Sequence, residues 1–273
     1  MNYTARYNLE FNPFIKNSKE TLIETIEYKE IKYRLDYLLK TKGFGLITGN
    51  PGLGKTTTIR NWANSLNQAA YKVIYLPLST LTVPESYRQL AYGLNVEPHY
   101  RKIDNFHEIQ SAIKRLSIDK KITPIIVFDE ANYMSNSMLN DLKILFNFDM
   151  DSKDYACVIL VGLPVLINTL NLKSHEPLRQ RITTSYNLEE LNQEEAIKYI
   201  KGKLSLAGCQ TQVFSEAALK ALVSYSKGNP RVISKVCNNA LLIGDKQGLN
   251  TIDEDVIMIA VNEIEVWWWK IKG

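Results

Sequence analysis

A glycine-rich loop between an expected strand and an expected helix constrains this chain more than any other feature. Residues 49–56 read GNPGLGKT, which fits G-x-x-x-x-G-K-[ST], the pattern of a phosphate-binding loop. The apolar run at 43–48 favours a buried strand before the loop, and the apolar spacing at 56–66 favours a helix after it. Glycines let the backbone approach a ligand, and the free N–H groups of the helix start then face bound phosphates. The sequence therefore predicts a nucleotide site on a strand, loop and helix.

The residues of this loop have separate expected roles. We expect the Lys55 amine to neutralise the β- and γ-phosphates and the Thr56 hydroxyl to bind Mg²⁺, so ATP and Mg²⁺ are the expected cofactors. GTP is disfavoured because the sequence has no N-K-x-D pattern for reading guanine. The nucleotide-binding residues expected in this stretch are Gly49, Asn50, Pro51, Gly52, Leu53, Gly54, Lys55, Thr56 and Thr57.

An apolar run at 123–128 ends in two adjacent acids, Asp129 and Glu130. Such a run is typical of a strand buried on both faces, and it would deliver both acids to the carboxyl edge of a sheet, beside the phosphate loop. We expect Asp129 to hold Mg²⁺ and Glu130 to polarise the water that attacks the γ-phosphate. Taken alone, the pair also fits an acidic helix cap.

Strands and helices alternate through the first two thirds of the chain, which predicts an α/β fold with a parallel sheet and helices on both sides. Further strands are expected at 72–76 and 155–161, and further helices at 21–40, 86–94, 106–116 and 137–148. Beyond residue 188 only helices are expected, and they begin at Asn192, Ser215, Asn229 and Asp253. We therefore expect an α/β domain at 1–187, a small helical lid domain at 188–266 and a tryptophan-rich tail at 267–273.

Composition limits the environment of the chain. No apolar run approaches the roughly 20 residues of a membrane span, and the N-terminus has no signal-peptide pattern. The three cysteines are widely spaced, which favours a reducing compartment. We expect a cytoplasmic protein without a membrane partner. The net charge of +4 permits a nucleic-acid partner without requiring one.

Three arginines are candidates for stabilising the charge that develops on the γ-phosphate. Arg179 and Arg181 precede the expected change of domain, and Arg231 lies in the first turn of an expected lid helix. A cation is unfavourable at that end of a helix, so a bound anion would explain Arg231. For each arginine alone, a surface ion pair is the simpler interpretation.

The motifs together resemble AAA+ ATPases, and more closely the ExeA-type branch. The resemblance spans roughly residues 8–265 and rests on seven stretches: NPF at 12–14, TGNPGLGKTT at 48–57, FDEAN at 128–132, LFNF at 145–148, LVGLP at 160–164, LRQRI at 178–182 and GNPRVI at 228–233. Two departures, Gly162 in place of a polar sensor residue and Asn132 in place of glutamine, imply slow or partner-dependent hydrolysis.

That branch implies two roles. The stand-alone transposition ATPases similar to TniB, TnsC and MuB bind double-stranded DNA as ATP-dependent rings or filaments, recruit a DDE-type transposase and bias target choice. The resemblance favours this role, and it implies that an arginine, preferably Arg181, contacts the ATP bound to a neighbouring subunit. A secretion or envelope-assembly ATPase is the alternative, and an ATP-gated signalling switch is a third reading.

Basic and hydroxyl side chains are the candidates for a nucleic-acid surface. Phosphate contacts use Lys, Arg, Ser and Thr, and loops from this region line the DNA path in the related ATPases. The candidates are Thr80, Thr82, Arg101, Lys102, Lys114, Lys120 and Lys121, each of which also fits a solvated helix face. Three adjacent tryptophans, Trp267 to Trp269, favour a protein contact over stacking on bases.

Overall fold

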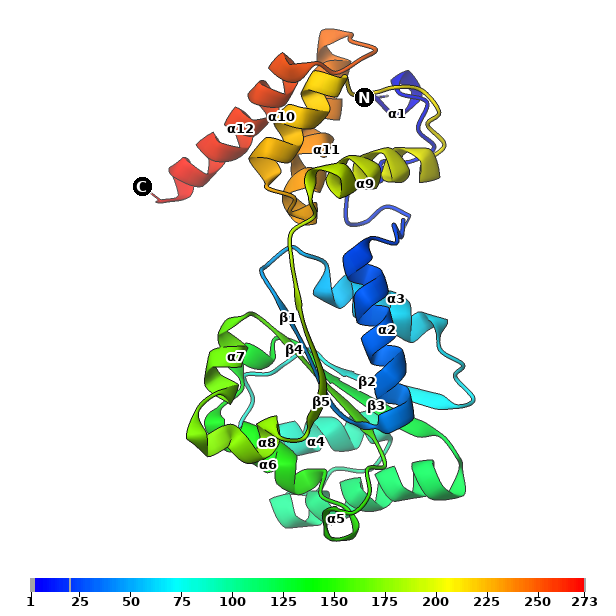
Figure 1. Cartoon of the computed structure of the whole chain (residues 1–273), viewed down its shortest axis with the longest axis vertical. Helices are drawn as coiled ribbons and strands as arrows, with labels where there is room; N and C mark the ends of the chain where they lie inside the picture. The colour runs from blue at the N-terminus through cyan, green and yellow to red at the C-terminus, as the bar shows by residue number, and fades with distance from the viewer. Residues whose placement is uncertain (1–2, 20, 273) are drawn as a thin grey trace. The chain divides into compact units, whose positions relative to one another are not determined.

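The computed structural model describes residues 3–19 and 21–272, with side chains through Glu265. The chain forms two compact units, which can be followed by colour in Figure 1. Residues 26–51 and 55–188 form the α/β unit. Residues 3–19, 21–25, 52–54 and 189–272 form the helical unit.

A parallel sheet is the framework of the α/β unit. Within the described residues it has five strands in the order β2-β3-β4-β1-β5. The phosphate loop follows β1 and the acid pair follows β3, and β4 lies between these two strands. Every strand pair is parallel. The strands are β1 (Gly43–Gly49), β2 (Tyr71–Leu76), β3 (Thr123–Phe128), β4 (Cys157–Gly162) and β5 (Ile182–Leu188). The predicted α/β fold with a parallel sheet is confirmed.

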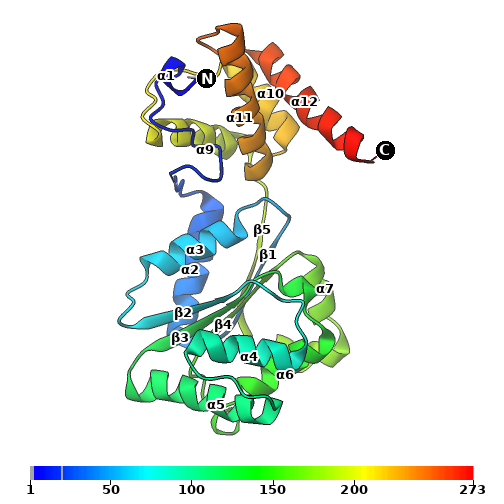
Figure 2. The ribbon, with the colours of Figure 1, turned by 180° about the vertical axis from the view of Figure 1, so that it is seen from behind.

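Helices cover both faces of this sheet. Helices α2 and α3 lie over one face, and α4, α5 and α6 lie over the other, as the two opposite views show (Figures 1 and 2). Residues that alternate along the strands enter the core beneath α4 to α6, including Phe44, Ile74 and Phe128. The helices of this unit are α2 (Ile26–Thr41), α3 (Lys55–Ser65), α4 (Val83–Leu94), α5 (Lys102–Lys114), α6 (Asn136–Leu145), α7 (Val165–Leu170) and α8 (Glu176–Arg179).

Strand β5 is absent from the sequence prediction. Its sequence, ITTSYNL, alternates buried and exposed positions and holds few apolar residues. It lies at the edge of the sheet, where it pairs with β1. An edge strand needs less apolar surface than a central one, so its hydrophobic signal is weak.

The helical unit is built from α1 (Tyr3–Arg6), α9 (Gln193–Leu206), α10 (Glu216–Ser226), α11 (Pro230–Gln247) and α12 (Glu254–Lys272). All four expected N-terminal caps are confirmed, since the side chains of Asn192, Ser215, Asn229 and Asp253 accept backbone N–H groups of their helices. Each such cap contributes about 1 kcal/mol.

The unit boundaries differ from the sequence expectation at both ends of the chain. Tyr7, Leu9 and Phe14 are buried in the core of the helical unit, although the expected α/β domain began at residue 1. The backbone of the expected C-terminal tail continues α12 as far as Lys272. The side chains of Trp267 to Trp269 lie outside the described residues.

No helix in the described part of the chain combines the length and apolar character needed to cross a membrane.

Trp62 joins the phosphate-loop helix to its neighbour. It is fully buried in α3, and its indole N–H donates to Asp36 of α2 at 2.9 Å. We predict that Trp62→Ala lowers the free energy of unfolding by about 3–5 kcal/mol, because it removes both the packing and the hydrogen bond. Chemical denaturation measures this. Tyr100→Ala, at a side chain that is 93% exposed, is the control and should change the value by less than about 0.5 kcal/mol. Equal effects of the two substitutions would contradict the packing role.

Candidate nucleotide site

The phosphate loop connects the end of β1 to the start of α3. The Lys55 amine is buried and donates to the backbone carbonyls of Gly49 at 2.6 Å and Asn50 at 3.1 Å. Gly52 and Gly54 have φ angles of +91° and +96°, in the left-handed region that favours glycine. The loop thus has the glycines that its shape needs, and its lysine lies folded against its own backbone.

Asp129 is the centre of a hydrogen-bond network at the carboxyl edge of the sheet. It is 5% exposed, and its Oδ2 accepts from the Thr56 hydroxyl at 2.9 Å and from the Tyr75 hydroxyl at 2.6 Å. Its Oδ1 accepts the N–H of Glu130 at 2.9 Å, and the Ser79 hydroxyl donates to its backbone carbonyl. The end of β3 is therefore tied to the start of α3 and to β2.

The Thr56 and Asp129 pair fits a Mg²⁺ site by its chemistry. Magnesium prefers oxygen ligands and usually takes only one or two from protein, completing its shell with water and substrate phosphates. Here a hydroxyl and a carboxylate oxygen lie within hydrogen-bond distance of each other beside a phosphate loop. The residues with described side chains contain no cluster of three or more His, Cys, Asp or Glu suited to a metal. Any Mg²⁺ here would depend on the nucleotide and on water for further ligands.

Glu130 has the exposure that its expected role requires. It follows β3 directly, its side chain is exposed, and its φ of +53° lies in the left-handed region. A non-glycine residue held there carries backbone strain, which persists where surrounding contacts fix the conformation. The hydrogen bond from its N–H to Asp129 is one such contact.

The two departures from the AAA+ pattern, Gly162 and Asn132, lie against each other. The Asn132 Oδ1 accepts the N–H of Leu163 at 2.9 Å, just beyond the end of β4. A Cβ at Gly162 would lie 2.7 Å from that same oxygen. The Asn132 side chain thus occupies the space that a side chain at 162 would need, and it brings an amide to the edge of the sheet between β1 and β3.

Tyr75 is a member of this network that sequence reasoning missed. Burial, followed by the hydrogen bond to Asp129, raises the pKa of its phenol, so it stays a donor at neutral pH. Its position one residue before the end of β2, opposite Val127 of β3, is the signal that could have identified it. Tyrosine in a strand is ordinarily assigned to packing, which hides such a role.

The two arginines before β5 have different surroundings. Arg181 is largely buried, pairs with Asp151, and donates to the carbonyls of Lys143 at 3.1 Å and Phe146 at 3.3 Å. Arg179 is exposed, with long hydrogen bonds to Asn171 at 3.4 and 3.5 Å. The sequence expectation preferred Arg181 for a neighbouring subunit, whereas these contacts favour Arg179, because Arg181 is held within its own fold.

Arg231 lies in the first turn of α11, in the helical unit. Its backbone N–H donates to the Asn229 side chain at 3.1 Å and to the carbonyl of Gly52 at 3.3 Å. A Cβ at Gly52 would lie 2.5 Å from Asn229 Oδ1, so this close approach needs glycine. The expected contact between Arg231 and the nucleotide stays a prediction.

Comparison with known proteins agrees with the fold of the α/β unit. Residues 38–170 match the family described as AAA domain. The α/β unit has a phosphate-loop AAA+ fold. Drosophila ORC bound to DNA is similar in structure, with a TM-score of 0.72 and 15% identity over 96% of this chain and 65% of that chain. At this identity the likeness shows the fold alone.

Two relatives match by sequence over most of the chain. General secretion pathway protein A of Aeromonas hydrophila is 28% identical over 269 residues, covering 96% of this chain. The chain spans about half of that relative, 48% of its length. A potential ATP-binding protein of Staphylococcus aureus is 23% identical over 272 residues, covering 90% of this chain and 97% of its own length.

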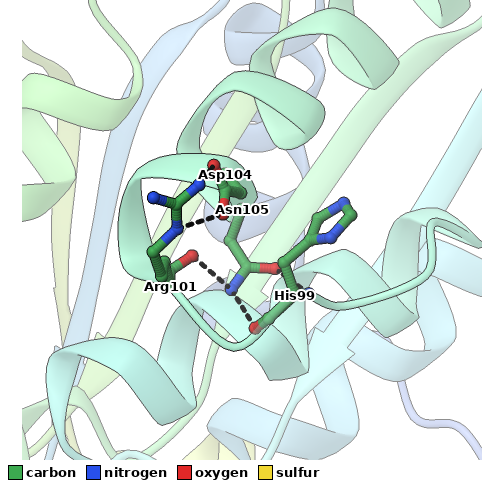
Figure 3. Close-up of polar contacts among 4 residues, drawn as sticks. All are labelled: His99, Arg101, Asp104 and Asn105. Carbon is green, nitrogen blue, oxygen red and sulfur yellow. Dashed lines mark hydrogen bonds and ion pairs between the residues drawn. The ribbon is translucent and has the colours of Figure 1, made fainter.

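Three of the expected DNA-contacting cations of the α/β unit have acidic partners. Arg101 is paired with Asp104 at 2.9 Å, as Figure 3 shows. Beside this pair, the Asn105 side-chain amide donates to the backbone carbonyls of His99 and Arg101 at the start of α5. Lys102 pairs with Asp141, and Lys114 pairs with Asp149 at 2.6 Å. These partners reduce the charge that the three side chains offer to a phosphate.

The remaining candidates are not brought together. Thr80 and Thr82 follow the carboxyl end of β2. Thr82 is the N-cap residue of α4, and its backbone N–H donates to the Glu85 carboxylate at 2.9 Å. Lys120 and Lys121 are exposed and precede the amino end of β3, the paired neighbour of β2. Because these strands are parallel, the two pairs lie at opposite ends of a six-residue strand, about 17 Å apart at least. The structure favours Lys120 and Lys121 as the cations to test.

The contact between Asn132 and Gly162 predicts a non-additive pair of substitutions. We expect Gly162→Ala alone to lower the free energy of unfolding by about 1–3 kcal/mol, because its Cβ collides with the Asn132 side chain. In an Asn132→Ala background the same change should cost less, with a coupling of at least about 0.5 kcal/mol in a double-mutant cycle. Additive effects in chemical denaturation would show that the two residues do not share this space.

Proposed function

We propose that this chain is an ATPase that binds double-stranded DNA largely without sequence preference when loaded with ATP and regulates DNA transposition. In this proposal it acts as an oligomeric ring or filament, takes part in target selection and recruits a DDE-type transposase. The observation that carries the ATPase part is the Thr56, Asp129 and Glu130 arrangement beside the phosphate loop.

The chemistry assigned to the site follows from its residues. Lys55 binds the phosphate oxygens after leaving the loop carbonyls, and Thr56 and Asp129 hold Mg²⁺, which supplies charge neutralisation when bound. Glu130 accepts the proton of the attacking water, because its carboxylate is exposed next to Asp129. Asn132 adds an amide donor at the same edge, in the role of the missing polar residue at 162.

The DNA-binding part rests on the charge of the chain and on a structural similarity. The net charge of +4 is compatible with a phosphate backbone, and the similar Drosophila ORC was determined bound to DNA. Three of the five candidate cations are paired with acids, so binding must draw on an assembly, in which many weak contacts act together. ATP would matter because it promotes that assembly.

A secretion-type ATPase is the second candidate. The 28% identity with general secretion pathway protein A extends over 96% of this chain and favours it. The two candidates share the nucleotide site and differ in the partner that ATP controls. If no duplex binds in the presence of ATP at low salt, the secretion-type function becomes the better proposal.

The salt dependence of DNA binding tests the first candidate. We predict that ATP, and not ADP, supports binding to two unrelated duplexes, with affinity that falls steeply as salt rises. Lys120→Ala and Lys121→Ala should each lower the slope of log affinity against log salt by roughly one. Lys102→Ala should leave the slope nearly unchanged, because that lysine is already paired with Asp141. Fluorescence anisotropy measures all of these, and equal slopes for the three variants would remove the proposed surface.

Subunit mixing tests the arginine assignment. We predict that Arg179→Ala and Lys55→Ala proteins, each inactive alone, regain ATPase activity when mixed, because one supplies an intact phosphate loop and the other an intact arginine. Arg181→Ala is the matched comparison and should chiefly lower the melting temperature, since it breaks contacts within the fold. No recovery on mixing, or ATPase activity that is independent of concentration in a strict monomer, would count against shared sites.

A further inference from the structure

A cavity of about 650 Å³ lies between helix α3 and strands β2 and β3, on the face of the sheet opposite α4. It arises because α2 and α3 pack over β1 on this side, whereas β2 is packed against α4 on the other. Ile74 and Leu76 of β2 are buried beneath α4, while Tyr75 is 47% exposed on the cavity side. The elements that surround it can be followed in Figure 2.

The lining has an apolar body and a cationic rim. The apolar part is formed by Ile59, Ala63, Leu66, Val73, Ile122 and Val127. Arg60 and Lys72 also line it. Burial, and the nearby charge of Lys120, lower the pKa of Lys72. Among the residues with described side chains, no carboxylate pairs with Lys72, so an anion at the rim would relieve the repulsion between the two lysines.

The size and chemistry of the cavity select its occupant. Its volume lies within the range of small-molecule sites, which are mostly apolar with a few polar groups that fix orientation. A polyphosphate would need several backbone N–H groups that face the cavity, whereas those of β2 and β3 lie in the plane of the sheet and those of α3 beyond its first turn bond within the helix. An apolar ring with one negative group suits the lining better.

Two of the lining residues belong to the nucleotide site. Thr56 and Tyr75 both line the cavity, and both donate to the same oxygen of Asp129. An occupant that contacts either side chain therefore acts on the carboxylate expected to hold Mg²⁺.

We propose that this cavity is a regulatory site for a small amphipathic anion, with an apolar ring against α3 and β2 and its charge beside Lys72. The binding does not depend on the proposed function. The effect on hydrolysis rests on the proposed ATPase activity.

The test uses the full chain with 1-anilinonaphthalene-8-sulfonate as the probe, in saturating Mg²⁺ and a non-hydrolysable ATP analogue. We expect one bound probe per chain by fluorescence titration. Ala63→Phe fills the cavity from α3 and should weaken binding at least tenfold, and Lys72→Gln should weaken it several-fold. Ala69→Phe and Lys198→Gln, at exposed positions outside the lining, are the matched controls and should leave it unchanged.

Melting temperatures confirm that each variant is folded. If Ala63→Phe does not fold, Val73→Phe replaces it in the test, because it fills the cavity from β2. Absence of binding, complete displacement by the ATP analogue, or equal binding by Ala63→Phe and Ala69→Phe would overturn the site. In the wild type the probe should also change ATP turnover, and Ala63→Phe should abolish that change. Binding without any change in turnover would overturn the regulatory role, and absent turnover with retained binding would overturn the ATPase proposal instead.

Discussion

The contact between the Thr56 hydroxyl and the Asp129 carboxylate depends on a constraint of parallel sheets. All five strands described in the α/β unit end at the same edge, so residues that follow β1 and β3 meet there although β4 lies between the two strands. The phosphate loop brings the start of α3 to this edge, and the apolar β3 delivers the acid pair. The phosphate loop and the acid pair form the nucleotide site together, and the order of the strands sets the distance between them.

The strand between them explains the unusual residues at this edge. A side chain on the last residue of β4 would collide with Asn132, and glycine at 162 leaves that space to an amide held by the N–H of Leu163. Tyr75 and Ser79 approach Asp129 from the end of β2 and the loop after it. Buried polar groups are costly unless they are paired, and here the Asp129 carboxylate and backbone carbonyl all find partners. Hydrogen bonds within the protein thus fix the position of Asp129.

The parts of the fold that sequence reasoning predicted are those with local signals. The phosphate loop, the buried strands β1, β3 and β4, and the caps at Asn192, Ser215 and Asn229 follow from residue spacing. Strand β5 was missed because an edge strand needs few apolar residues, and Tyr75 was missed because its partner lies 54 residues away. The pairing of Arg181 with Asp151, and of Lys102 with Asp141, also depends on long-range packing that no local pattern contains. Those pairings change which arginine and which lysines the proposals rely on.

The most direct measurement is ATP binding and turnover in Glu130→Gln beside Lys55→Ala. Calorimetry should find that Glu130→Gln retains ATP affinity, since Lys55, Thr56 and Asp129 are intact, and phosphate release should fall by about 10² or more because the general base is lost. Lys55→Ala should lose nucleotide binding itself, because the charge that faces the phosphates is removed. Unchanged turnover in Glu130→Gln, or unchanged binding in Lys55→Ala, would contradict the assignment of this edge of the sheet as the site of ATP hydrolysis.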